Sequence, residues 1–259
     1  MIQFSSLCTK MSLGFIILRH INSTLTGEYW QRAYTCIRKL YPDTPILVVD
    51  DNSVPEYANT EAQTTFVTHN CTIVNSPFPP QRAELLPYFF FHTLKPFDRA
   101  VILQDSVYIH QPLQLDNMNE CTFLWHFYHN ADEPAFEQHI INHLAPPTTD
   151  LLKSVHANQD MWLGCLGTMS VIDWTFLDRL VTRYNLFNLV DVITDRMFRM
   201  GLERVFAVIA TCESPALQFN HWPSLFGWDF PKFQLTFEEY KAEQAKYEQY
   251  PAVKVWTGR

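Results

Sequence analysis

Basic residues are scarce in this chain. It holds 19 lysines and arginines against 27 aspartates and glutamates, which gives a formal net charge of −8 over 259 residues. Binding to a nucleic-acid backbone requires a basic surface, and this composition opposes one. We therefore expect no nucleic-acid partner, whereas a small nucleotide held by a metal ion is compatible with the charge.

Long apolar runs and closely spaced cysteines are also lacking. No apolar run approaches the roughly 18 residues of a membrane span, and no segment has the apolar core and cleavage site of a secretory signal. The six cysteines are widely spread, without a Cys-x-x-Cys clip. These absences predict reduced thiols and a cytoplasmic protein without a membrane span.

Hydrophobic residues make up 47% of the chain, enough for a full core. An α/β fold of this length often forms one domain. Because Met11 directly precedes the first apolar run, we predict a disordered extension over residues 1–10 and a single domain over residues 11–259.

Apolar runs of strand length alternate with helical patterns in the N-terminal half. This alternation predicts an α/β fold with a mostly parallel central sheet flanked by helices. The runs at 45–50 and 100–104 end in carboxylates, at Asp50-Asp51 and at Asp105. Because open α/β sheets bind ligands beyond the carboxyl ends of their strands, we expect these acids to share one cleft. The other strands predicted in this half cover residues 14–18 and 71–75.

Glycine is a third scarce residue type, and two of the seven glycines lie in the strand-like run at 164–172. Their clustering indicates close approach of a ligand or another backbone. The run at 213–235 is rich in aromatics and prolines without periodicity, which suits a loop folded over a cleft. Pro87 implies a kink in a predicted helix. Other predicted elements include a helix between the first two strands, a helix after residue 172, helices at 82–94, about 195–211 and 238–249, and a strand at 121–127.

Two strand-end motifs resemble those of GT-A nucleotide-diphospho-sugar transferases. Val48-Val49-Asp50-Asp51-Asn52-Ser53 is similar to the family's signature, and Leu103-Gln104-Asp105-Ser106-Val107-Tyr108 is similar to its acidic metal motif. A wider pattern resembles a small viral and marine-microbial group within that fold. It comprises Phe15 to His20 with Trp30, Trp162 to Cys165, Leu202 to Arg204, and Lys254 to Arg259.

The resemblance implies a glycosyltransferase that moves a hexosyl or deoxyhexosyl group from a nucleotide-diphosphate sugar to a hydroxyl of a glycan or other acceptor. It implies a nucleotide-binding half over about 11–110 and an acceptor-binding half over about 111–259. A viral origin would place the protein in the host cytoplasm.

The resemblance also implies a metal ion at Asp105. Mn²⁺ or Mg²⁺ would neutralise the leaving diphosphate, and such ions often use one or two protein carboxylates. Gln104 departs from the family, which commonly has an acid at that position. The alternative role for Asp105 is to cap the next turn.

Nucleotide contacts are expected from several parts of the chain. Asp51 would accept a hydrogen bond from a base N–H, and Asp50 would hold the ribose or the turn. Alternatively, both acids form a turn with Asn52 and Ser53. Four basic residues are expected to contact the nucleotide: Arg19, which lies beside His20, and Arg82, Lys254 and Arg259. For Arg82, Lys254 and Arg259, the alternative is a solvent-exposed side chain.

Sugar transfer needs a base that deprotonates the acceptor hydroxyl. Glu203 follows the glycine-bearing strand and its helix, where the family has a catalytic acid pair, of which Glu203-Arg204 remains. The alternative is an ion pair between Arg199 and Glu203 at i, i+4. Asp160 is the rival base, and Asp195 is a weaker third candidate.

Three other functions share part of this pattern. A signalling receiver domain also carries paired acids at a strand tip, but it needs half this length and a later lysine-tipped strand. A sugar-nucleotide binder without turnover would explain Gln104 and the incomplete acid pair. A nucleotidyltransferase would need a glycine- and lysine-rich loop near the first strand, which is absent.

The pairs His126/His129 and His139/His143 lack the neighbouring motifs of a zinc site.

Overall fold

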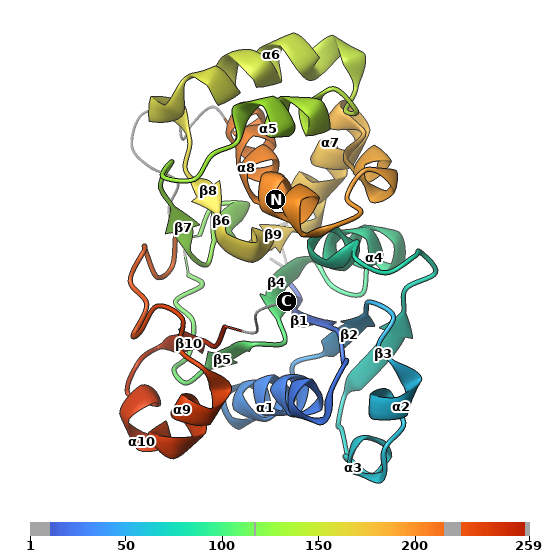
Figure 1. Cartoon of the computed structure of the whole chain (residues 1–259), viewed down its shortest axis with the longest axis vertical. Helices are drawn as coiled ribbons and strands as arrows, with labels where there is room; N and C mark the ends of the chain where they lie inside the picture. Colours follow the sequence, from blue (N-terminus) through green and yellow to red (C-terminus); the bar gives the residue numbers. More distant parts are fainter. Residues whose placement is uncertain (1–10, 117, 215–223, 257–259) are drawn as a thin grey trace, which may run out of the picture.

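The computed structural model describes residues 11–116, 118–214 and 224–256. Within these ranges a six-stranded sheet has the order β3-β2-β1-β4-β9-β6 (Figure 1). Adjacent strands among the first four pair in parallel, whereas β9 runs antiparallel to both β4 and β6. The predicted α/β fold with a mostly parallel sheet is therefore confirmed. The strands are β1 (Leu13–Arg19), β2 (Ile46–Asp50), β3 (Cys71–Asn75), β4 (Arg99–Gln104), β6 (Cys121–Phe123) and β9 (Ser170–Asp173).

Helices cover both faces of the sheet because alternate strand residues point to opposite sides. Ile16 and Leu18 of β1 join one buried cluster, and Phe15 and Ile17 join the other. The first cluster includes residues of α4 (Leu86–Leu94), α5 (Pro134–Ile141), α6 (Pro146–Ala157), α7 (Trp174–Tyr184) and α8 (Arg196–Glu213). The second includes residues of α1 (Thr24–Leu40), α9 (Phe237–Ala242) and the pair β5 (Val107–Ile109) and β10 (Ala252–Lys254) (Figure 1).

The strand order differs from that of a receiver domain. A flavodoxin-like sheet has the order 2-1-3-4-5, whereas β3-β2-β1-β4 here matches the 3-2-1-4 run of the classic doubly wound fold. The antiparallel β9 is a further difference. The topology therefore disfavours the receiver interpretation.

Pro87 does not kink a helix. A short 3₁₀ turn, η1 (Ala83–Leu85), comes first, and α4 begins at Leu86, so Pro87 lies in its first turn. Proline has no backbone N–H, but an N–H in the first turn of a helix would have no intrahelical partner, so proline is tolerated there. The predicted helix at 82–94 is therefore two elements.

Two predicted strands are each interrupted. The run 121–127 divides into β6 and β7 (His126–Phe127), and 164–172 divides into β8 (Gly164–Cys165), η3 (Leu166–Thr168) and β9. Gly167 at φ +59° and Thr168 at φ +48° interrupt the strand without reversing it, so that β9 pairs antiparallel with β6 and β8 pairs antiparallel with β7.

The C-terminal helix also divides, into α9 and α10 (Gln244–Tyr247) on either side of Glu243. The shorter elements are α2 (Pro55–Ala58), α3 (Glu61–Thr64), η2 (Gln159–Met161) and η4 (Leu186–Asp191). Residues 1–10 and part of the predicted 213–235 loop lie outside the described residues. Among the described helices, none has the length and apolar character needed to cross a membrane.

Candidate active site

Three strand ends meet at one edge of the sheet. In the strand register, Arg19 of β1 lies opposite Asp50 of β2, and Leu18 lies opposite Gln104 of β4. The Asp51 N–H donates to the Arg19 carbonyl oxygen at 2.8 Å, and the Asp105 N–H donates to that of Leu18 at 2.9 Å. Strand β1 thus brings both acidic strand tips together, as the sequence predicted.

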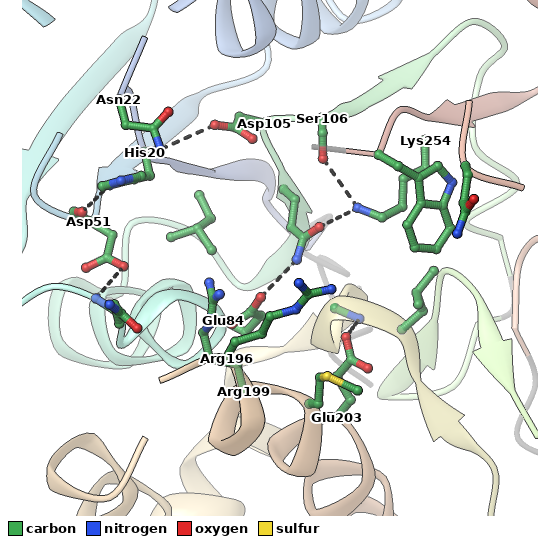
Figure 2. A pocket seen from close by; sticks show the side chains of 18 of the residues that line it. His20, Asn22, Asp51, Glu84, Asp105, Ser106, Arg196, Arg199, Glu203 and Lys254 are labelled. Carbon is green, nitrogen blue, oxygen red and sulfur yellow. Dashed lines mark hydrogen bonds between the residues drawn. The ribbon is translucent and has the colours of Figure 1, made fainter. Parts of the chain in front are cut away.

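A cavity of about 780 Å³ opens at this edge (Figure 2). Its size falls within the usual range of ligand pockets. The N-terminal half contributes His20, Asp51 and Asp105, which follow the three strand ends. The C-terminal half contributes Lys254 from β10 and one face of α8. The α8 side chains, spaced i, i+3, i+4 and i+7, are Arg196, Arg199, Met200 and Glu203.

Glu203 is held by a backbone N–H of η3. The Gly167 N–H donates to Glu203 Oε1 at 2.7 Å. Gly167 has φ +59°, and a Cβ added there would lie 2.8 Å from Gln104 Nε2, so a side chain at this position would be strained and would displace the Gln104 amide. The clustered glycines predict close approach of a ligand or another backbone. At Gly167, the groups that approach are the side chains of Gln104 and Glu203.

The Glu203 carboxyl titrates near neutral pH. Burial, followed by the neighbouring Glu84, raises the pKa of Glu203 to about 7, although the bond from Gly167 partly opposes this shift. A side chain with this pKa exists substantially as carboxylate at neutral pH and still accepts a proton readily. Glu203 therefore has the protonation properties of a general base.

Gln104 connects Glu84 to Lys254 through its side-chain amide. Gln104 Nε2 donates to Glu84 Oε1 at 3.1 Å, which leaves Gln104 Oε1 to accept from Lys254 Nζ at 2.5 Å. Lys254 Nζ also donates to Ser106 Oγ at 3.3 Å. Antiparallel pairing of β10 with β5 places Lys254 opposite Val107, which explains how a residue so late in the chain reaches this edge. Burial raises the pKa of Glu84.

The residues around Asp105 do not fit the expected Mn²⁺ or Mg²⁺ ion. The Asp105 carboxylate accepts the His20 backbone N–H at 3.3 Å. Its neighbours Gln104 and Ser106 are neutral and contact an ammonium group. Among the described residues, no group of three or more His, Cys, Asp or Glu side chains could hold a metal by itself, so an ion here would depend on Asp105 and the substrate phosphates while the residues on either side of Asp105 contact an ammonium group. We therefore derive no chemical step through a metal ion.

Asp50 and Arg19 stabilise the strand end, and neither is among the described residues that line the cavity. Asp50 Oδ1 accepts the Ser53 N–H at 2.7 Å, and Oδ2 accepts the Ser53 hydroxyl and Arg19 Nε, each at 2.6 Å. The Arg19 guanidinium lies over the Trp30 ring. Arg82 donates to two backbone carbonyl oxygens, each at 3.0 Å, and also lies away from the cavity lining. Asp50 thus has the turn-forming role that the sequence left open.

The rival bases also lie away from the described cavity lining. Asp160 is exposed in the 3₁₀ turn η2. Asp195 caps α8, where its Oδ1 accepts the N–H groups of residues 197 and 198. Arg259 lies outside the described residues.

Sequence reasoning missed Arg196, Glu84 and the cavity-facing role of Arg199. The helical spacing of Arg196, Arg199 and Glu203 was a usable signal, because it predicts one shared helix face. Arg199 Nε is buried and, among the described residues, has no hydrogen-bond partner. The described ion pairs do not include Arg199 with Glu203, whose Oε1 accepts from Gly167 instead.

The raised pKa of Glu203 predicts a pH-dependent stability. The carboxyl binds its proton more tightly in the folded chain, with a pKa of about 7 against an ordinary value of 4.5. The full stability is therefore present below pH of about 4.5 and declines as pH rises to about 7, by up to about 3 kcal/mol. Glu203→Gln should remove this decline. Urea unfolding at pH 5 and pH 8 checks it: a gap between variant and wild type that is the same at both pH values would contradict the expectation.

Among the comparisons with known proteins, only the comparison with solved structures finds similar proteins. No family model matches the chain, and no curated protein matches its sequence. The structure resembles core-mannan synthase A of Aspergillus fumigatus in its Mn/GDP form, with 10% identity, a TM-score of 0.45, and coverage of 83% of this chain and 72% of that one. It also resembles the mannosyltransferase Ktr4p of S. cerevisiae, with 11% identity, a TM-score of 0.46, and coverage of 78% and 66%. For S. aureus TarS residues 1–349 with UDP-GlcNAc, the identity is 10%, the TM-score 0.34, and the coverage 65% and 47%.

Proposed function

We propose that this protein is a glycosyltransferase that moves a hexosyl or deoxyhexosyl group from a nucleotide-diphosphate sugar to an acceptor hydroxyl. One observation carries the proposal: a single cavity combines the cationic Arg196, Arg199 and Lys254 with Glu203, whose pKa is about 7. Cations suit a diphosphate leaving group, and a carboxylate near neutrality suits proton removal from a hydroxyl.

The residues divide between three tasks. Asp51 and Asp105, at the carboxyl ends of the strands, face the nucleoside, and Asp51 accepts a hydrogen bond from the base. Lys254 and the two arginines bind the diphosphate. Glu203 takes the proton of the acceptor hydroxyl as its oxygen attacks the anomeric carbon. The proposal contains no metal ion, because the surroundings of Asp105 do not fit one.

Nucleotide binding is the first test. We expect one of UDP, GDP or CDP to raise the melting temperature, because a ligand that binds the folded state alone stabilises it by about 2.7 kcal/mol at a hundredfold excess over its Kd. ATP, with a different phosphate chain, serves as the comparison nucleotide. Binding followed by release of the donor sugar supports the transferase. Binding without release from any donor sugar would indicate the sugar-nucleotide binder, and no shift with any nucleotide would remove the proposal.

The acceptor side is an aromatic surface that continues from the cavity. Trp256 lines the cavity, and its ring lies 4.7 Å from that of Phe233 and 6.0 Å from that of Phe230. Phe230 leads on to Trp228 at 5.3 Å. A hollow of about 300 Å³ is lined by Trp228, Asp229, Phe230 and Phe233. Trp228 is 41% exposed and Phe233 is 56% exposed, which suits stacking against the apolar face of a glycan acceptor while Asp229 accepts from its hydroxyls.

Trp228→Ala should therefore raise the KM for a glycan acceptor by about tenfold, because it removes an aromatic contact of about 1.4 kcal/mol. The Kd of the nucleotide should not change. Tyr250→Ala is the matched control, since Tyr250 is also 41% exposed and belongs to neither cavity lining. Steady-state kinetics with varied acceptor measures the effect, and an equal KM in both variants would place the acceptor elsewhere.

A further inference from the structure

The side chains around Asp105 point in alternating directions. Gln104 and Ser106 both accept from the Lys254 ammonium, whereas Asp105 between them accepts the His20 backbone N–H. Asp105 and Ser106 form the turn between β4 and β5, and the contacts with Lys254 show that the side chains of residues 104 and 106 share one side of it. A pair of metal ligands on the Lys254 side would therefore use positions 104 and 106. Both of these positions hold neutral residues, and both contact a lysine.

The Lys254 ammonium is fixed in place. Lys254 is buried, and strand β10 is held against β5 with Lys254 opposite Val107. The next residue, Val255, donates its N–H to the Ser106 carbonyl oxygen at 2.9 Å. Glu84 accepts from the Gln104 amide nitrogen and so directs the amide oxygen to the ammonium. A positive charge is thus already positioned before any ligand binds.

Arginines from α8 face the same cavity. Arg199 and Arg196 lie about one helical turn apart in its lining, and Figure 2 shows both beside Glu84. The buried Arg199 Nε has no hydrogen-bond partner among the described residues. A guanidinium with an unpaired Nε–H in a cavity suits phosphate oxygens, which can accept paired hydrogen bonds from an arginine.

We propose that Lys254, Arg199 and Arg196 neutralise the donor diphosphate in place of a divalent ion, so that this site binds its nucleotide and transfers sugar without a metal. This inference rests on the proposed function and specifies its charge chemistry. When the bond between the anomeric carbon and the phosphate oxygen breaks, that oxygen keeps the bonding electrons. The acceptor oxygen forms the new bond to the carbon, and its proton passes to Glu203. The added negative charge on the diphosphate is stabilised by these three cations.

Calorimetric titration with UDP, GDP and CDP, each in excess EDTA and in excess Mn²⁺, tests the inference. For the nucleotide that binds, we expect the Kd in EDTA to agree with that in Mn²⁺ within about threefold. Lys254→Met should weaken binding in EDTA by about ten- to a hundredfold, the effect of losing hydrogen bonds from a charged donor. Lys241→Met is the control, since Lys241 is exposed and pairs with Glu28 away from the cavity.

Arg199→Gln provides a second variant on a different element, so that a folding defect of Lys254→Met leaves the inference testable. It too should weaken binding in EDTA about tenfold. Binding that disappears in EDTA and returns with Mn²⁺ would overturn the inference and leave the proposed function standing. Unchanged affinity in both variants would also overturn it. An absence of binding by every nucleotide in both buffers would remove the proposed function as well.

Discussion

Glu203→Gln should lower the turnover of sugar transfer by about a hundred- to ten-thousandfold, the usual contribution of a general base. The glutamine keeps the shape and can still accept the Gly167 N–H, which donates to Oε1 at 2.7 Å in the native chain. It cannot take a proton from the acceptor hydroxyl. We expect nucleotide affinity to change little, because the cations and strand-end acids remain. Steady-state kinetics combined with nucleotide titration separates the two effects.

Asp160→Asn is the matched control for this experiment. It makes the same carboxyl-to-amide change at the rival base that the sequence proposed, but in an exposed 3₁₀ turn away from the described cavity lining. Turnover should stay within about twofold of wild type, the small effect typical of surface substitutions. A large loss in Asp160→Asn with normal turnover in Glu203→Gln would reverse the assignment of the base.

Arg204→Ala should lower the free energy of unfolding by about 3–5 kcal/mol, the cost of breaking a buried ion pair from one side. Arg204 Nε lies 2.7 Å from Asp132 Oδ1 and 3.0 Å from Glu137 Oε1, and all three side chains are at most 5% exposed. The Arg204 Nη2 group also donates to the Ala131 carbonyl oxygen. Without the guanidinium, two carboxylates would remain buried with their main counter-charge removed.

Arg183→Ala tests whether burial is the cause. Arg183 also pairs with a carboxylate, with its Nη1 at 3.1 Å from Glu213 Oε2, but its side chain is 53% exposed. Because Arg183 is exposed, and because the Glu213 side chain, which is 7% exposed, keeps its ion pair with Arg179, the variant should lose only about 0–1 kcal/mol. Urea denaturation of both variants provides the comparison. Equal losses of stability would show that Arg204 has no special role in the core.

Arg204 also shows where sequence reasoning reached its limit. From the sequence, the adjacent Glu203-Arg204 resembles the remainder of a catalytic acid pair. Adjacent helical residues point about 100° apart, so the two side chains enter different environments. Glu203 lines the cavity, whereas Arg204 joins Asp132 and Glu137 in the core. Burial on both sides of a helix cannot be read from two neighbouring residues.

The sheet and its acidic edge could be predicted because their signals are local. Apolar runs of strand length alternate with helical patterns, and carboxylates follow β2 and β4 directly. Parallel pairing with β1 between them then places Asp51 and Asp105 at one edge. Periodicity and the rule on strand ends were sufficient for this part of the fold.

The chemistry around Lys254 depends on contacts that sequence does not display. Gln104 and Lys254 are 150 residues apart, and the pairing of β10 with β5 alone brings them together. For Asp50, the acid at a strand tip is visible in the sequence. The hydrogen bonds that its carboxylate accepts from Ser53 and Arg19 are not visible there. In the sequence, Gln104 stands where a metal-binding acid is expected, whereas in the structure its amide oxygen accepts a hydrogen bond from Lys254.

The central claim is that the protein transfers a sugar with Glu203 as the base. The most direct test measures the rate of nucleoside diphosphate release from a panel of UDP- and GDP-sugars between pH 5.5 and 8.5. We expect release from one donor in the presence of a glycan acceptor. Because Glu203 must be deprotonated, and its pKa is about 7, the rate should rise about tenfold per pH unit below pH 7 and level off above it. The Glu203→Gln variant should lack this rise. Release that is independent of pH and unaffected by Glu203→Gln, or no release from any donor that binds, would contradict the account.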